Sequence, residues 1–201
     1  MRLMVKAIAP IALAGALAGC SLGGMLGGGG KAPVTLQTLT SEAADPGTIT
    51  RTVNAGQAVT IGMPSMPKEL RTVRVPVQLT PTDIQYVTGL QWVDTPDHLF
   101  QALVAETVRR TTGRVVLDPR QATLDPGLQV TGALERFGYD ASSRQAMVVY
   151  DAALATDGGS HVETRRFVAN MPADGTGPGV GQALNRAANQ VALDVAKWIG
   201  G

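Results

Sequence analysis

Apolar and polar residues alternate along residues 73–79, where valine or leucine at every second position is separated by arginine, proline or glutamine. A period of two is typical of a strand that buries one face. Pro76 lies inside this run, and because proline has no backbone N–H to donate, it indicates an edge strand or a bulge. Residues 84–87 are expected to pair back on this strand as a short hairpin arm.

Further strands are predicted where β-branched and other apolar residues cluster between turn-forming residues. They are residues 34–40, 49–53, 58–61, 115–117, 128–134, 146–154 and 161–169. Residues 54–56, Asn-Ala-Gly, suit a hairpin turn between the second and third of these segments. Residues 140–143 and 157–159 are rich in Asp, Ser and Gly, and predict the turns between the last strands.

A first amphipathic helix is predicted to start at residue 96. Thr95 can cap it, and Pro96 suits the first helical position, where a missing N–H costs nothing. Arg109 and Arg110 suit the negative end of the helix dipole. Gly113 is expected to end the helix in the left-handed conformation.

A second amphipathic helix is predicted to reach residue 199, after a loop rich in Gly and Pro at residues 172–181. Its apolar residues are spaced by three and four; they are Val180, Leu184, Ala187, Val191, Val195 and Trp198. Asn185 and Asn189 lie on its polar side.

The predicted order of elements is strands, helix, strands, helix. Aromatic residues make up only 4% of the chain, so the core should consist mainly of Val, Ala and Leu. This order predicts an α+β fold, with two helices packed on one face of a mainly antiparallel sheet.

The start of the chain has the features of a lipoprotein signal peptide. Two basic residues, Arg2 and Lys6, precede a short apolar stretch, which ends in Leu17-Ala18-Gly19-Cys20. Cys20 is the only cysteine, and its thiol can carry diacylglycerol in thioether linkage. Cleavage before it would free an amine for a further acyl chain. A buried cysteine and a transmembrane helix are the alternatives, but the stretch is shorter than the roughly 20 residues of a membrane span.

The sequence therefore divides into three parts: a signal peptide at residues 1–19, a lipidated glycine-rich tether at 20–32, and one folded domain at 33–201. Ser21 after the cysteine favours sorting to the outer membrane in Gram-negative bacteria. Removal of Arg2 and Lys6 leaves 15 basic and 16 acidic side chains. This balance argues against binding to nucleic acid or to an anionic membrane by bulk charge.

Two glycine-rich runs are considered as nucleotide-binding loops and set aside. In residues 23–30 the required glycine is replaced by Met25, and Ala32 stands where Ser or Thr should follow the lysine. In residues 175–181, Gln182 stands at the third glycine position of a dinucleotide loop.

No catalytic constellation emerges from the remaining polar residues. His98 and His161 are the only histidines, and both are expected to be exposed. The chain has no Gly-x-Ser-x-Gly motif, and spacing alone pairs no two of the scattered aspartates: Asp83, Asp94, Asp97, Asp118, Asp125 and Asp151. We therefore expect a protein that is not an enzyme, with no catalytic residue, metal or cofactor other than the lipid on Cys20.

Three further side chains have a predicted role. Trp198 continues the stripe of the last helix and should pack in the core. Trp92 either joins the first helix to the sheet or lies exposed at an interface, where tryptophan is enriched. Arg165 and Arg166 should point to opposite faces of a strand, and one of them can protect an edge against aggregation.

Several segments together resemble the ABC-type transport auxiliary lipoproteins. They are the lipobox Leu17-Ala18-Gly19-Cys20, Arg74-Val75-Pro76, Ile84-Gln85-Tyr86-Val87, Gln91-Trp92-Val93-Asp94-Thr95-Pro96, Phe137 with residues 146–154, Arg166-Phe167, and the helix from Ala183-Leu184-Asn185 to Trp198. The family includes the lipoprotein of the paraquat-inducible lipid-transport system. Its members partner mammalian-cell-entry (MCE) proteins and an ABC transporter in moving lipids between the two membranes.

The resemblance implies an accessory lipoprotein on the periplasmic face of the outer membrane, which docks an MCE protein and ABC transporter components. A homo-oligomer is compatible with this role. The alternative is a lipoprotein that regulates or assembles another envelope machine, such as a cell-wall synthase. A periplasmic hydrolase is disfavoured because no nucleophile and base are paired.

Overall fold

The computed structural model describes residues 36–54, 56–125 and 127–200. The chain divides into two units, Met1–Pro33 and Val34–Gly201, and the described residues belong to the second. The predicted signal peptide, the lipidated Cys20 and the tether lie outside the described residues.

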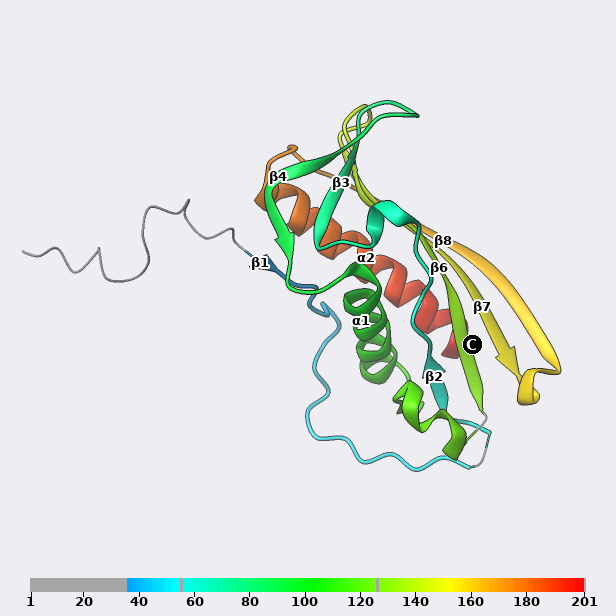
Figure 1. The fold of residues 1–201 in the computed structure, drawn as a ribbon. Coiled ribbons are helices and arrows are strands. Elements are labelled where there is room, and N and C mark those ends of the chain that lie inside the picture. Colours follow the sequence, from blue (N-terminus) through cyan, green and yellow to red (C-terminus); the bar gives the residue numbers. More distant parts are fainter. Residues whose placement is uncertain (1–35, 55, 126, 201) are drawn as a thin grey trace, which may run out of the picture. The chain divides into compact units, whose positions relative to one another are not determined.

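The described residues form one sheet and two α-helices (Figure 1). The strands are β1 (Leu36–Gln37), β2 (Val59–Ile61), β3 (Arg74–Gln78), β4 (Ile84–Trp92), β5 (Val116–Leu117), β6 (Leu128–Asp140), β7 (Gln145–Thr156) and β8 (His161–Pro172). The helices are α1 (Pro96–Thr111) and α2 (Gly177–Gly200), and short 3-10 turns occupy Lys68–Leu70, Pro119–Leu124 and Asp157–Gly159.

The sheet is mixed, so the expectation of a mainly antiparallel sheet is wrong. Among the described strands, four pairings are parallel: β1–β4, β2–β5, β2–β6 and β3–β6. The antiparallel pairings are β3–β4, β6–β7 and β7–β8. The parallel pairings involve short strands that return after long connections, as parallel pairing requires. Local alternation of residues predicts hairpins but carries no signal for such returns.

Strand β6 organises the sheet because it is paired along both edges. One edge pairs with β7 over nearly its whole length. The other edge is shared by β2 near Leu128 and by β3 near Tyr139. The long β6–β7–β8 ribbon therefore forms the base on which the shorter strands assemble.

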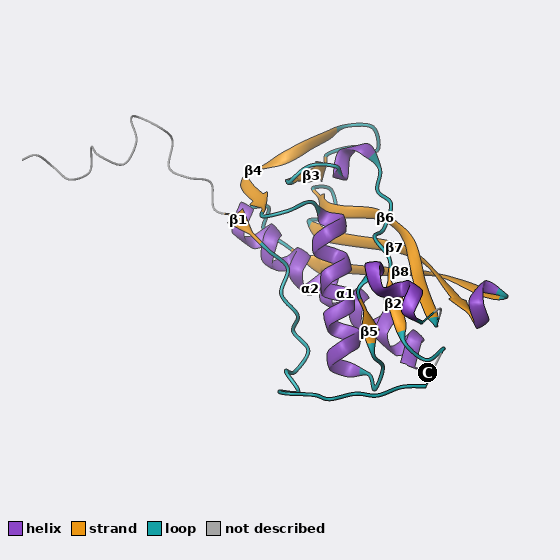
Figure 2. Cartoon of the chain, turned by 60° about the horizontal axis from the view of Figure 1, so that its bottom comes forward, coloured by secondary structure: helices purple, strands orange, loops and turns teal. Residues whose placement is uncertain are grey.

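The helices α1 and α2 pack against each other, and α2 also lies against β7 and β8 (Figure 2). Alternate residues of β7 are buried beneath the helices: Ala146, Val148, Tyr150, Ala152 and Leu154. Phe100 of α1 meets the ring of Tyr150 edge-on, with ring centroids 5.0 Å apart, which places α1 over the same face. Burial raises the pKa of Tyr150 to about 12.

Several local predictions are confirmed in the described residues. Helix α1 begins at Pro96, and the apolar stripe of α2 from Val180 to Val195 is buried. The hairpin arm after residue 84 exists, although β4 continues to Trp92. The register of β3 shifts between Arg74 and Pro76, which confirms the bulge.

Other local predictions are wrong. Strand β3 lies between β4 and β6, so Pro76 is not on an edge strand. Gly113 has no positive φ; α1 ends at Thr111, and the capping residue Thr112 has an extended backbone. Helix α2 already begins at Gly177, within the predicted loop. The segment 49–53 forms no strand, so there is no hairpin with β2.

Residues 38–54 instead form an extended segment that we call the strap. It leads from β1 past α1 towards β2, drawn in blue to cyan in Figure 1. Apart from Leu39, which packs partly against the core, its side chains are mostly exposed. Few apolar contacts hold it, and its position must depend on polar ones.

Candidate functional site

The two histidines lie on different elements and have local roles or none. In the first turn of α1, His98 Nδ1 is 3.0 Å from Asp94 Oδ2, and both side chains are about half exposed. The N–H of Thr95 donates to Asp94 and is the main reason that the pKa of this carboxyl is lowered, followed by the contact with His98. His161 is exposed at the start of β8.

The aspartates are occupied by nearby donors. Hydrogen bonds from Arg120 lower the pKa of Asp118, and those from Arg166 lower the pKa of Asp151. Asp125 accepts the N–H groups of Gly56 and Ala58 at 2.6 and 3.1 Å. A carboxyl that acts as a general acid needs a raised pKa. The lowered pKa values of Asp118 and Asp151 are instead typical of carboxylates that hold the structure together.

The last two aspartates also bond locally. Asp83 accepts the hydroxyl of Thr80 at 2.8 Å, and Asp97 accepts the hydroxyl of Thr95. Across residues 36–54, 56–125 and 127–200, no three His, Cys, Asp or Glu side chains are grouped as metal ligands. That the protein is not an enzyme stays a prediction.

The glycine run at residues 175–181 serves close packing. A Cβ on Gly181 would come within 1.6 Å of the Gln37 side-chain oxygen, and one on Gly177 within 3.2 Å of the Thr88 carbonyl oxygen. The Gln37 amide is the end of a flexible side chain that can turn away, whereas the Thr88 carbonyl is backbone, so Gly177 is the position where glycine lets β4 approach the first turn of α2. The spacing that resembles a dinucleotide loop therefore has a packing explanation.

Asn185 and Asn189 fasten the strap to α2. The N–H of Thr40 donates to Asn185 Oδ1 at 2.8 Å, and the N–H of Glu42 donates to Asn189 Oδ1 at 2.7 Å. In return, Asn189 Nδ2 donates to the Thr40 carbonyl at 2.8 Å. Asn185 Nδ2 donates to the Glu42 carboxylate at 3.1 Å. We call these two side chains the asparagine clamp.

The asparagine clamp was missed at the sequence level, where both residues were placed on the polar side of the helix. Their spacing of four places them on one face of α2, one turn apart. Asn189 is only 7% exposed. Because a buried amide requires partners, an asparagine pair bordering the apolar stripe is the signal that could have predicted a bound segment.

Asn189→Ala is expected to lower the free energy of unfolding by about 2 kcal/mol, because it leaves the Glu42 N–H and the Thr40 carbonyl without partners. Urea denaturation followed by circular dichroism measures the change. Asn170→Ala, on the exposed face of β8, is the matched control and should change stability by less than about 0.5 kcal/mol. Equal effects of the two substitutions would contradict a specific role of Asn189.

The two tryptophans are placed differently. Trp92 is 1% exposed and packs against Phe137, with ring centroids 5.6 Å apart, so it is a core residue and not an exposed interface residue. Trp198 is half-buried against Phe167 at 5.5 Å, and its Nε1 donates to Glu163 at 2.8 Å. The predicted packing of Trp198 on the core is confirmed.

Strand β8 pairs only with β7 among the described strands, so its other edge is open. Val162 and Val168 are 56% and 52% exposed on it. Arg166 forms an ion pair with Asp151, while Arg165 lies over the ring of Phe167. The two arginines thus point to opposite faces, as predicted, and Arg166 places charge in the middle of an otherwise open strand.

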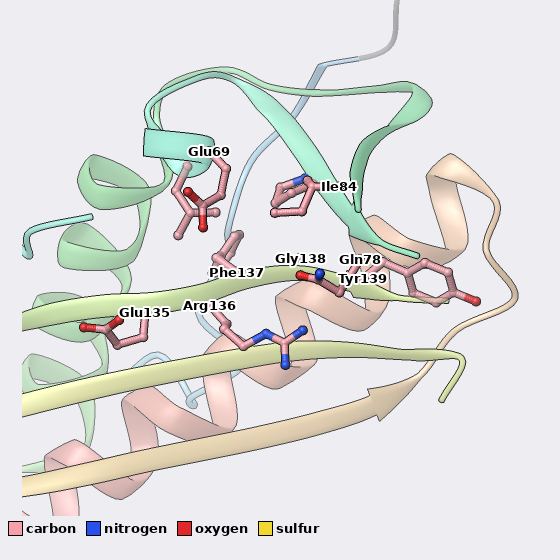
Figure 3. Close-up of a pocket in the computed structure, with 10 residues that line it drawn as sticks. Glu69, Gln78, Ile84, Glu135, Arg136, Phe137, Gly138 and Tyr139 are labelled. Atoms are coloured by element: carbon pink, nitrogen blue, oxygen red, sulfur yellow. The ribbon is translucent and has the colours of Figure 1, made fainter. Parts of the chain in front are cut away.

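A small cavity lies between the 3-10 turn at Lys68–Leu70 and strands β3 and β6. Figure 3 shows Glu69 and Ile84 on one side of it and residues 135–139 of β6 on the other. Its volume of about 40 Å³ is enough for a water molecule but too small for an organic ligand. Among the residues that the structure describes, no helix is long and apolar enough to cross a membrane.

The domain matches one known family of proteins. The family model of the ABC-type transport auxiliary lipoprotein component matches residues 38–196, almost all of the described domain. The chain belongs to this family. No curated protein sequence matches it.

Solved structures share the fold. A Xanthomonas campestris protein of the DUF330 family has a TM-score of 0.67 at 18% identity, and the match covers 83% of this chain and 95% of that one. The crystal structure of an uncharacterized protein has a TM-score of 0.61 at 13% identity, covering 75% of this chain and 96% of that one.

Proposed function

We propose that the protein is an accessory lipoprotein of an MCE-type ABC lipid-transport system. Lipid on Cys20 would hold it in the outer membrane, and the domain would act from the periplasmic side by docking to its partners. The observation that carries the proposal is the family match over residues 38–196, because it includes the strap, both helices and every described strand except β1.

Docking is tested by photo-crosslinking in cells, with a photoreactive amino acid at exposed apolar positions on four parts of the domain. These positions are Ile49, Leu79, Val93 and Val168. At least one position is expected to capture an MCE protein or a component of the ABC transporter. A buried position such as Val148 is the control and should capture nothing.

The same panel separates the alternatives. Capture only of a cell-wall synthase or of an outer-membrane assembly factor would replace the transport role with the regulatory one. The proposal also requires that alanine at His98 or His161 leaves the outer-membrane permeability barrier intact. If a histidine variant that folds and binds its partners lost the barrier, the accessory role would have to be replaced by an enzymatic one.

A further inference from the structure

Four arginines gather where α1 ends. Arg109 and Arg110 are in its last turn, Arg114 follows it, and Arg51 comes from the strap. They line an open cavity of about 320 Å³, in which Glu106 is the only acidic residue among the described lining residues. The lining therefore carries a formal charge of +3, in a chain whose predicted mature form is close to neutral.

Backbone carbonyl groups hold the guanidinium groups of Arg51, Arg110 and Arg114 in place. Arg51 Nη1 donates to the carbonyl oxygens of Arg109 and Arg114, at 2.6 and 3.1 Å. Arg110 Nη1 donates to the carbonyl of Ala43 at 2.9 Å. A guanidinium has five N–H donors, so these bonds fix its position and leave donors for another acceptor. Such a fixed arrangement lowers the cost of binding an anion.

Stabilisation of the helix end explains only part of this cluster. Cations are favourable at the carbonyl end of a helix, which accounts for Arg51. Arg109, however, is about half exposed, and its side chain contacts Glu106, which it shares with Arg110. Hydrogen bonding to Arg110, followed by the charge of Arg109, lowers the pKa of Glu106. One carboxylate thus faces more positive charge than it neutralises.

A second open cavity continues the first along α1. Its volume is about 470 Å³, and it shares Glu106, Arg109 and Val116 with the cationic cavity. Its lining includes four leucines, Leu39, Leu99, Leu103 and Leu117, and also polar residues: Thr38, Ser41, Gln101 and Asp118. Both volumes fall within the range of roughly 300–1,000 Å³ that is usual for small-molecule sites. We call the two cavities together the α1 groove; the strap lines both parts.

We propose that the α1 groove binds an anionic amphiphile, with a phosphate headgroup at Arg51 and Arg109 and a hydrocarbon chain along the leucines. One guanidinium group can donate two parallel hydrogen bonds to two oxygens of a phosphate. The leucines of the second cavity would remove the hydrocarbon chain from water. This site goes beyond the proposed function, because docking to a protein partner does not require a lipid in the groove.

The test is photolabelling of the mature lipoprotein in a neutral detergent, with phosphatidic acid that carries a diazirine in its acyl chain. Mass spectrometry should locate the label on α1, the strap or β5. In the protein that combines Arg51→Gln with Arg109→Gln, the concentration of phosphatidic acid that gives half-maximal labelling should rise at least about tenfold, as expected for lost charge-assisted hydrogen bonds. Arg166→Gln is the matched control, because Arg166 also pairs with one carboxylate but lies on β8, and it should label like the native protein.

Thermal melting checks that each variant is folded. If the double variant does not fold, Arg109→Glu alone decides, since the side chain of Arg109 bonds only to the side chain of Glu106 among the described residues. This reversal of charge should abolish labelling in the groove. Unchanged labelling in a folded Arg109→Glu protein would overturn the proposal.

Two further arms separate the possible ligands. Diacylglycerol with the same photoreactive chain should label the groove weakly; equal labelling would show an apolar site without headgroup recognition and overturn the proposal. Inorganic phosphate should compete poorly, and competition equal to that of short-chain phosphatidic acid would reduce the site to a phosphate site. Partner crosslinking does not depend on these results, so the docking proposal and the lipid proposal can fail separately.

Discussion

Cys20→Ala is expected to abolish acylation and to leave the protein as an uncleaved precursor. No other residue of the chain has a thiol, so no other side chain can accept diacylglycerol in thioether linkage. Metabolic labelling with radioactive palmitate, followed by immunoprecipitation, measures the loss, and gel mobility reports the retained signal peptide. Ser21→Ala keeps the thiol and is the control. Acyl label that persists in Cys20→Ala would disprove the predicted anchor.

The same variant also tests the proposed function. If the domain works only when held at the outer membrane, Cys20→Ala should impair the permeability barrier as much as deletion of the gene. A normal barrier in cells that contain the unacylated protein at native levels would show that the anchor is dispensable. Because Cys20 precedes residues 36–200, which form the described sheet and helices, loss of stability is not expected to contribute.

Trp92→Ala is expected to lower the free energy of unfolding by about 3–5 kcal/mol, the usual cost of removing a fully buried large aromatic side chain. Trp92 is among the largest fully buried side chains, and it packs on Phe137 of β6. Within the described residues its Nε1 has no hydrogen-bond partner. Trp92→Phe, which keeps a ring and removes this N–H, should therefore cost less than half as much.

Urea denaturation of the soluble domain from residue 32 measures both changes. Val93→Ala is the control at the next position, because Val93 is 52% exposed and its truncation should cost less than about 0.5 kcal/mol. A loss below about 1 kcal/mol for Trp92→Ala would show that the core adjusts around the missing ring.

The sequence predicted elements whose signals are local. The strand at residues 146–154, the start of α1 at Pro96 and the stripe of α2 each depend on residues within one element, and each is confirmed. The parallel pairings of β2 with β5 and β6 depend on where the chain returns after α1. No local pattern of residues records that path, so the sheet type was predicted wrongly.

The candidate sites were harder to predict because they arise between segments. The asparagine clamp joins residues separated by about 145 positions, and its partners on the strap are mostly backbone groups. Arg51 meets Arg109 across 58 positions. Residues 49–53 are rich in β-branched side chains, which is why they were predicted as a strand. In the structure, Arg51 bonds to the end of α1, and residues 49–53 pair with no described strand. Every residue has a backbone carbonyl group, and nearly every residue has an N–H, so a hydrogen bond to the backbone does not constrain the partner's side chain and cannot be recognised in the sequence.

The strap has a mechanical consequence for a protein held at its N-terminus. Tension applied through residue 36 would first load the two-residue β1–β4 pairing, then the asparagine clamp, and then the bonds that join Ala43 to Arg110 and Arg51 to the end of α1. All three are small sets of hydrogen bonds outside the main core, so they should yield before the β6–β7–β8 ribbon does. Residues 36–54 would then extend to roughly 60–70 Å at about 3.3–3.6 Å per residue. A domain anchored through Cys20, as proposed, would thus have a reserve of reach towards a distant partner while its helices and central strands stay folded.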